Sequence, residues 1–488
     1  MSPDPIPNPA QLLQRGRAFH ETGNTSEAAA CYRQILELQP DHADALHLLG
    51  LVELQRNDPK AAIVAIRKAL AADDGRAVYY NSLGLVLTDL QQLQPAVEAF
   101  DRAIALDPAL AEANNNRGLA LRELGLWDEA VASFDRAIAI TPNAAEPYNN
   151  RGMVLMDQGK LEEAMASFDL AYAIDSQYFG ALWNKSLCLL LAGRWEEAWP
   201  LHEWRWKVTP PTRAFAEPLW LGAQSLRGKS ILLHSEQGLG DTIQFARYIK
   251  LVADLGARTI VEVDRPLVTL IEAVAGVGRI IERGAPLPPF DFQCPLLSLP
   301  LAFKTTPANL PHAPSYLKAS AVKTAYWARK LGPKGRPRIG VVWSGNPTHK
   351  NDRHRSIPLA DFAHVFSEHF DFFSLQKDTR PSDQDALLRH PRLRHFGDSL
   401  ESFLDSAALC DLMDLVISVD TSLAHLAGAL GKSVWILLPS NPDWRWSLDG
   451  DRTPWYPSAR LCRQQRPNDW AAVLRKVKAD LSARFAAP

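Results

Sequence analysis

The sequence predicts an α solenoid followed by an α/β region built from two lobes, each with a parallel sheet. A small residue recurs every 34 positions through roughly the first 200 residues. From residue 229 onward, short apolar runs alternate with helical stretches, which is typical of parallel sheets. All fourteen tryptophans except Trp127 lie at or after residue 183, so the two parts also differ in composition.

Three columns define the 34-residue repeat. The first column is small and holds Gly16, Gly50, Gly84, Gly118, Gly152 and Ser186. Twelve residues later comes a second small column of Ala28, Ala62, Ala96, Ala130, Ala164 and Ala198. Four further on stands a large residue, at Tyr32, Ile66, Phe100, Phe134, Phe168 and His202. With prolines closing several units, this order resembles the tetratricopeptide repeat (TPR), a helix-turn-helix unit. We expect the small residues to let the two helices of a unit approach closely, and the large one to fill the gap to the next unit.

Composition bounds the possible functions. The chain of 488 residues has length for about three domains, and 47% apolar residues with a net charge of −2 argue against non-specific nucleic-acid binding. No long uncharged apolar run predicts a membrane span, and the start lacks the pattern of a secretory signal. Five scattered cysteines predict reduced, buried thiols and no metal site. We therefore expect a cytoplasmic protein.

The expected domains follow these patterns. The TPR array spans residues 9–212, with about five full repeats and a degenerate capping repeat, and residues 213–228 form a linker. The first lobe covers 229–331 and the second covers 338–488. The tryptophan-rich end of the array departs from the repeat at His202–Trp206. We expect its apolar face to dock on the next domain.

Alternating strands and helices predict two Rossmann-like lobes with a cleft between them. The expected strands are Ile231–Ser235, Thr259–Val263, Arg338–Trp343, Phe372–Leu375, Leu415–Val419 and Val434–Leu438. The expected helices are 241–255, 266–275, 319–331, 400–409 and 421–430. Ligands of such sheets bind at the carboxyl ends of the strands, so the loops there are the candidate sites.

The loop Glu236–Asp241 follows the first expected strand. Its two glycines let the backbone approach a ligand, but Ile243 stands where a dinucleotide fingerprint needs a third glycine. Asp241 has two interpretations: an N-cap of the following helix, or a carboxylate in the cleft placed to take a proton.

The turn Asp420–His425 follows the strand Leu415–Val419. Its hydroxyls and the N–H groups of a helix start suit a diphosphate. His425 is either a satisfied core histidine or part of the site.

Two further loops follow strands of the second lobe. Trp343–Asn346 is followed by the cations Lys350 and Arg355, which fits an anionic leaving group or a solvated basic loop. Pro442–Trp446 offers aromatic rings and a carboxylate for a sugar or base, with packing as the alternative.

Asparagines recur in two neighbouring columns of the array. One column holds Asn116, Asn150 and Asn184, and the other holds Asn81, Asn115 and Asn149. A line of asparagines along the superhelix can hydrogen-bond an extended peptide without reading its side chains. The alternative is that they brace the turns between repeats.

Gly-Leu-Gly-Asp-Thr-Ile-Gln-Phe at 238–245 and Val-Asp-Thr-Ser-Leu-Ala-His-Leu-Ala-Gly-Ala at 419–429 resemble GT-B glycosyltransferases of the heptosyltransferase-like type. The whole chain resembles bacterial TPR–glycosyltransferase fusions, which include flagellin glycosyltransferases and are similar in layout to O-GlcNAc transferases. The resemblance implies an α solenoid followed by an α/β GT-B fold of two Rossmann-like lobes.

The resemblance also implies roles for residues. Asp241 matches the base that deprotonates the acceptor. The expected nucleotide-sugar site comprises Gln237, Gly238, Gly240, Ser344, Asn346, Lys350, Arg355, Gln376, Lys377, Asp420, Thr421, Ser422, His425, Asp443 and Trp444. The six asparagines are the expected acceptor-binding residues.

The implied function is a metal-independent transfer of a sugar from a nucleotide-sugar to a Ser/Thr hydroxyl of a protein held by the array, flagellin being one candidate. No cofactor, nucleic acid or membrane span is expected, and self-association through the repeats stays open. The alternative is a protein-binding scaffold with an inactive transferase-like half.

Overall fold

The computed structural model describes residues 8–211, 213–311, 313–349 and 351–486. Tertiary contacts divide the chain into two compact units, one ending at Lys185 and the other beginning at Ser186. The expected end of the array at residue 212 follows the repeat register, whereas this division falls inside the sixth repeat. Among the described residues, no helix is both long and apolar enough to cross a membrane.

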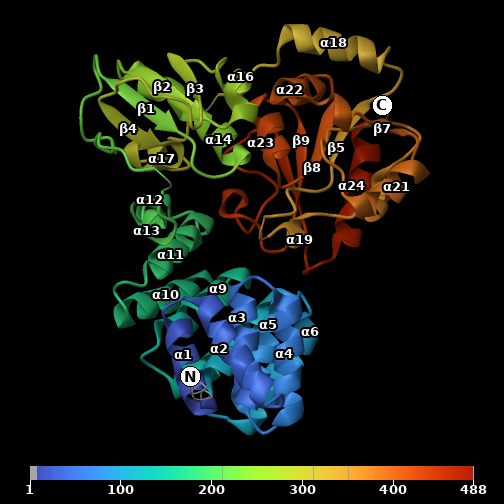
Figure 1. Ribbon diagram of the computed structural model, residues 1–488. Coiled ribbons are helices and arrows are strands. Elements are labelled where there is room, and N and C mark those ends of the chain that lie inside the picture. The colour runs from blue at the N-terminus through green and yellow to red at the C-terminus, as the bar shows by residue number, and fades with distance from the viewer. Residues whose placement is uncertain (1–7, 212, 312, 350, 487–488) are drawn as a thin grey trace, which may run out of the picture. The chain divides into compact units, whose positions relative to one another are not determined.

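The first unit consists of helix pairs, which Figure 1 shows in blue to green. Its helices are α1 Pro9–Glu21, α2 Thr25–Leu38, α3 Ala43–Gln55, α4 Pro59–Ala72, α5 Ala77–Asp89, α6 Leu93–Leu106, α7 Ala111–Leu124, α8 Trp127–Ile140, α9 Ala145–Asp157 and α10 Leu161–Ile174; α11 Phe179–Leu191 crosses the boundary. The odd-numbered helices begin 34 residues apart, as the sequence period predicts. The N-terminal part of the chain therefore consists of helix pairs that repeat every 34 residues, the arrangement expected of TPR repeats.

The small and large columns meet inside each unit. A Cβ atom on Gly84 would lie 2.4 Å from the ring of Phe100, and one on Gly118 would lie 2.7 Å from Phe134. At that separation a Cβ atom would force the ring or the helix to shift, so glycine lets the two helices pack this closely without strain. The Phe100 ring also belongs to a core cluster with Ala120 of the next unit. The large residue thus packs both between the two helices of its own unit and against the next unit, rather than only in the gap between units.

Ion pairs connect neighbouring repeats on the outside of these cores. Each joins a residue on the first helix of one unit to an aspartate sixteen residues earlier. The pairs are Arg117–Asp101, Arg151–Asp135 and Lys185–Asp169. Because the aspartates are half exposed, each pair contributes modestly to stability.

The second unit holds two parallel sheets, coloured green to yellow and orange to red in Figure 1. The first sheet has the order β3-β2-β1-β4. Its strands are β1 Ser230–His234, β2 Arg258–Val263, β3 Arg279–Glu282 and β4 Phe292–Pro295, with helices α14 Leu239–Phe245, α15 Ile249–Asp254, α16 Val268–Ile271 and α17 Leu299–Ala302. The expected helix 241–255 is divided by a 3-10 turn at Ala246–Tyr248.

The second sheet has the order β10-β9-β8-β5-β6-β7. Its strands are β5 Arg338–Val342, β6 Asp371–Ser374, β7 Leu393–His395, β8 Leu415–Val419, β9 Val434–Leu438 and β10 Ala459–Arg463. Its helices are α18 Ala321–Leu331, α19 Asp352–Arg355, α20 Leu359–Phe362, α21 Gln384–Arg389, α22 Phe403–Asp411, α23 Ser422–Ala429 and α24 Trp470–Arg484. Numbered from β5, this is the doubly wound order 3-2-1-4-5-6, whose direction reverses between β5 and β8.

The tryptophan-rich segment packs on these lobes, as its composition predicted. It forms α12 Trp195–His202 and α13 Arg205–Val208. The Trp195 ring stacks on Trp455 with centroids 5.1 Å apart, and the indole N–H of Trp199 donates to the Thr305 carbonyl at 2.8 Å.

Candidate functional site

The carboxyl ends of β1 and β8 meet through the helices that follow them. A Cβ atom on Gly240, in α14, would lie 2.9 Å from Cδ2 of His425, in α23. Glycine therefore lets a helix of the first lobe pack directly on a helix of the second. The expected loops of both lobes are thereby brought to one place.

Both oxygens of Asp241 are engaged. Oδ2 accepts the Gly238 N–H at 2.8 Å. Gly238 is the N-cap residue of α14 and Asp241 is its third helical residue, so the interpretation of Asp241 as the N-cap is wrong, although its carboxylate does bond the backbone at the start of the helix. Oδ1 accepts a hydrogen bond from Nη2 of Arg445 in the other lobe. Gln237 is exposed at the edge of this loop.

Arg445 is the centre of the cluster, and the sequence analysis missed it. Its Nε donates to Gln244 at 2.5 Å and its Nη1 donates to Asp443 at 2.8 Å. The guanidinium lies 4.4 Å from the Trp444 ring. Burial disfavours its charge, but Asp443 and Asp241 hold the pKa of Arg445 above its ordinary value. Arg445 and Gln244 stood inside the motifs quoted above, yet only the fold joins them.

Asp420 and Arg355 follow β8 and β5, the neighbouring strands between which the strand order of the second sheet reverses. Arg355, mostly buried, donates from Nη1 to the Asp420 carbonyl at 2.9 Å. Thr421 is the N-cap residue of α23, and its hydroxyl pairs with Ser418 at 3.2 Å instead of capping the helix. The partly exposed Ser422 follows as the first residue of the helix.

The Asp420 carboxyl stands in a crowded charge environment. Burial, with Asp443 nearby, raises its pKa to about 6. The positive charges of Arg355 and Arg445 oppose that rise. An anion placed beside this carboxyl would raise its pKa further.

His425 is buried behind the turn. Its Nδ1 pairs with the Tyr456 hydroxyl at 2.9 Å and its ring stacks on Trp446 with centroids 5.3 Å apart. Nε2 lies 4.0 Å from Asp420 Oδ1. Burial, and then Arg445, lower the pKa of His425 well below its ordinary value. Burial therefore favours the neutral ring, which bonds through Nδ1 to Tyr456.

Ser344 and Gln376 bond each other at the ends of β5 and β6. The amide of Gln376 donates to the Ser344 carbonyl and hydroxyl at 2.9 and 3.0 Å, and its oxygen accepts the Ser344 N–H at 3.4 Å. Both side chains are buried. The pair ties two strand ends together beneath the site.

The loop after β5 carries the remaining expected residues. Asn346 accepts from the backbone and hydroxyl of Thr348 at 3.0 Å, a local turn. Lys377, from the loop after β6, is exposed. Lys350 lies outside the described residues. Partial desolvation and Arg355 lower the pKa of His349, while Asp352 and more weakly Asp443 and Asp241 act against that shift.

The asparagine columns are paired across repeats. Asn116 donates to Asn81 at 3.1 Å, Asn150 to Asn115 at 3.0 Å and Asn184 to Asn149 at 2.9 Å. His47 and Ser82 make the equivalent pair at 2.8 Å. These bonds brace neighbouring units, as the alternative interpretation held. They use part of each amide's capacity, so binding of a peptide stays a prediction.

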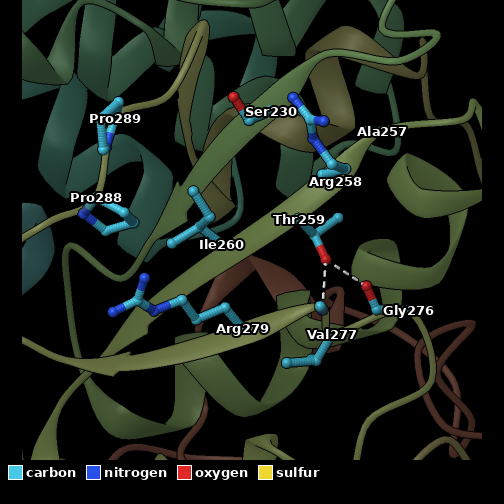
Figure 2. Close-up of a pocket in the computed structure, with 11 residues that line it drawn as sticks. Ser230, Ala257, Arg258, Thr259, Ile260, Gly276, Val277, Arg279, Pro288 and Pro289 are labelled. Atoms are coloured by element: carbon cyan, nitrogen blue, oxygen red, sulfur yellow. Dashed lines mark hydrogen bonds between the residues drawn. The ribbon is translucent and has the colours of Figure 1, made fainter.

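A pocket of about 640 Å³ lies elsewhere in the first lobe, as Figure 2 shows. It is lined at the amino ends of the strands by Ser230, Arg258, Thr259 and Arg279, with Pro288 and Pro289 beside them. Thr259 Oγ1 accepts the Gly278 N–H at 2.8 Å and donates to the Gly276 carbonyl, which closes its floor. Because parallel sheets bind ligands at the opposite edge, we do not assign the site here.

Comparison with known proteins identifies the first part of the chain. The tetratricopeptide repeat family matches residues 13–77, 81–145 and 145–178. The matching families include no glycosyltransferase. These matches support protein binding by the N-terminal repeats.

Individual relatives cover the chain in part. Protein FlbA of Caulobacter vibrioides is 27% identical over 287 residues, 53% of this chain and 47% of FlbA. Type IV pilus assembly protein PilF of Pseudomonas aeruginosa is 37% identical over 70 residues, 14% of this chain and 28% of PilF. The chain therefore spans about half or less of these curated relatives.

Among solved structures, MamA is 27% identical with a TM-score of 0.31, covering 33% of this chain and 94% of MamA. YrrB, titled a TPR protein with an unusual peptide-binding site, is 27% identical with a TM-score of 0.32, covering 37% of this chain and 93% of YrrB.

Proposed function

We propose that the chain is a glycosyltransferase of GT-B type, in which the second lobe binds the diphosphate of a nucleotide-sugar and the repeats hold the protein acceptor. The observation that carries this proposal is the bond from Arg355 to the Asp420 carbonyl. It brings a guanidinium beside the start of α23, at the reversal point of a doubly wound sheet, where such folds bind nucleotides.

The charges fit an anionic leaving group. The dipole of α23 and the guanidinium of Arg355 would face the phosphates, while Arg445 lies next to them with two carboxylates already paired. Fixed dipoles and cations of this kind stabilise developing negative charge without a metal ion. We therefore expect chelator to leave transfer unchanged.

Asp241 is the proposed base. It would take the proton of the acceptor hydroxyl as that oxygen bonds to the anomeric carbon, and the bond from that carbon to the phosphate oxygen would break, releasing the nucleoside diphosphate. Because Oδ1 is held by Arg445, the hydroxyl must compete with the guanidinium for that oxygen or approach beside it.

The acceptor is proposed to be a protein with a Ser/Thr hydroxyl, with flagellin as one candidate. The array of TPR repeats supports a protein partner. If the asparagine columns bind the acceptor, alanine at Asn116, Asn150 and Asn184 together will impair modification of the full-length acceptor and spare donor binding. If the folded triple variant binds the acceptor as tightly as the parent chain does, these asparagines only hold neighbouring repeats together.

A scaffold with an inactive α/β domain is the second candidate. The observation that favours it is that each carboxylate oxygen of Asp241 already accepts a hydrogen bond. In that case no nucleoside phosphate stabilises the chain. A ligand present at 100 times its Kd would add about 2.7 kcal/mol to the free energy of unfolding, which a thermal shift detects.

Calorimetry with a panel of nucleoside diphosphates and CMP tests the proposed donor site. Arg355→Ala and His425→Ala should each weaken the nucleotide that binds by about 1.5–3 kcal/mol, the value of a hydrogen bond to a charged group. Arg353→Ala, at an exposed position of the same short helix, is the matched control. Unchanged affinity in both variants, or no binding by the parent chain, contradicts the proposal.

A further inference from the structure

The segment Trp195–Val208, which forms α12 and α13, contacts in each lobe a residue close in sequence to the Asp241–Arg445 ion pair. On the second lobe, the Trp199 ring meets Trp444 edge-on with centroids 5.7 Å apart. Trp444 is in turn the residue that carries the guanidinium of Arg445 on its face.

On the first lobe, the same segment forms hydrogen bonds with Glu236, in the loop 236–241 that carries Asp241. Nη2 of Arg205 donates to the two carboxylate oxygens of Glu236 at 3.0 and 3.1 Å. It also donates to the Ser298 hydroxyl at 2.8 Å, and Nη1 donates to Glu203 at 2.6 Å. Arg205 is 3% exposed, so this cluster is out of water.

Such a cluster is costly to bury. It holds two carboxylates against one guanidinium, and burial raises the pKa of Glu236 to about 7 although Arg205 opposes the rise. A buried ion pair adds little net stability, but removing one partner leaves the other charge buried without compensation, which is strongly destabilising. What the cluster does provide is a fixed position for Glu236, two residues before Gly238, whose N–H holds Asp241.

We propose that Arg205 is a positioning residue for the site: through Glu236 it fixes the loop 236–241, and with it the Asp241 carboxylate. The inference rests on the proposed function for its kinetic consequence. It makes the segment Trp195–Val208 part of the transferase site, although the sequence repeat assigns this segment to the array. The division of the chain by tertiary contacts agrees with this assignment, because the second compact unit begins at Ser186 and so includes the segment Trp195–Val208.

The test compares Arg205→Met, Arg205→Lys and Glu236→Gln in the full-length chain. The matched control is Arg194→Met, which removes an exposed ion pair with Glu197 at the start of α12. Two readouts are needed: kcat and KM of transfer, and hydrogen exchange of the amides in 235–245, which requires no activity.

Arg205→Met should lower kcat about 10–100-fold, the cost of misplacing a reacting group by an ångström or less, with the KM for the donor within about twofold. Arg205→Lys keeps the charge but not the two-pronged geometry, so its loss should be intermediate. Glu236→Gln keeps an acceptor for Arg205 and should stay closest to the parent. Exchange in 235–245 should rise in the same order, and Arg194→Met should change neither readout.

The two claims can fail separately. If the parent chain has no transfer activity, yet Arg205→Met speeds exchange in 235–245 alone, the proposed function is wrong and the positioning inference stands. If the parent is active and Arg205→Met, verified as folded, leaves both kcat and exchange unchanged, the positioning inference is wrong. A rise in donor KM with unchanged kcat also overturns it, because that result assigns Arg205 to donor binding.

Discussion

The repeat array and the α/β domain differ in how far apart in the sequence the residues lie that their side-chain hydrogen bonds join. In the array, side-chain bonds join residues 35 or 16 apart and recur from unit to unit, as Asn116–Asn81 and Arg117–Asp101 do. In the α/β domain, the bonds that form the site join Arg445 to Asp241 and to Gln244, 204 and 201 residues apart, and neither recurs. Periodicity therefore reveals the array, whereas the site exists only once the lobes have folded together.

The largest expected effect is in the α/β domain. Arg445→Met leaves the carboxylates of Asp241 and Asp443 without their cation. Breaking a buried ion pair in this way lowers the free energy of unfolding by about 3–5 kcal/mol. Urea unfolding should show the loss in the transition of the α/β domain, leaving that of the array in place. Arg452→Met, at an exposed position, should change neither transition. A common shift of both transitions would contradict the separation of the two regions.

The second prediction tests the array through pH. Burial lowers the pKa of His47 to about 4, with Asp44 opposing that shift. Because the unfolded chain binds this proton below about pH 6.5, stability should fall as pH drops from 6.5 to 4, by up to about 3 kcal/mol. Denaturant titrations at several pH values measure it.

His47→Asn with Ser82→Asn copies the Asn81–Asn116 pair of the next units into this position and is the matched variant for that experiment. It should remove most of the pH dependence between 6.5 and 4. If the dependence persists unchanged, another group is responsible.

Gly84→Ala should be the next largest effect. Alanine gains about 1 kcal/mol of helix propensity, but its Cβ would stand 2.4 Å from the fully buried Phe100 ring. Overpacking of a core costs about 1–3 kcal/mol, so we expect a net loss of stability. Gly75→Ala, where the nearest atom is 3.4 Å away, serves as the control. A variant more stable than the parent would mean that the helices can separate without cost.

The smallest expected effect is in the asparagine columns. Asn150→Ala removes the bond to Asn115 and should cost about 0.5–1.5 kcal/mol. Asn143→Ala, in an exposed turn, is the comparison. No difference between the two variants would show that the pair does not brace the repeats.

The strands of the α/β domain show what sequence patterns can predict. The buried inner strands β8 and β9 have the bounds that their continuous apolar runs predicted. Four strands were missed, namely β3, β4, β7 and β10, and all four are sheet edges. Edge strands are short and partly exposed, with polar residues such as Arg279 and Glu282, so they lack a clear apolar run.

The candidate site was predictable to the same extent. Asp241 and Asp420 were found because each follows a strand, and the carboxyl ends of parallel strands gather ligands. Arg445, Gln244 and Arg205 were not found, because the bonds that bring them to the site span long stretches of sequence: Arg445 reaches Gln244 and Asp241 201 and 204 residues away, and Arg205 reaches Glu236 31 residues away. A charged residue's burial and pairing are tertiary properties, and no local pattern encodes them.

The central claim is that a protein held by the array receives a sugar at the Asp241 site. The most direct test is intact-mass spectrometry of cellular proteins in strains that carry the parent chain, Asp241→Asn or neither. Losing a general base costs about 10²–10⁴ in rate. We predict a protein that is heavier by a sugar residue with the parent chain and unshifted with the other two. An equal mass shift with folded Asp241→Asn, or no shifted protein with the parent chain, would contradict the account.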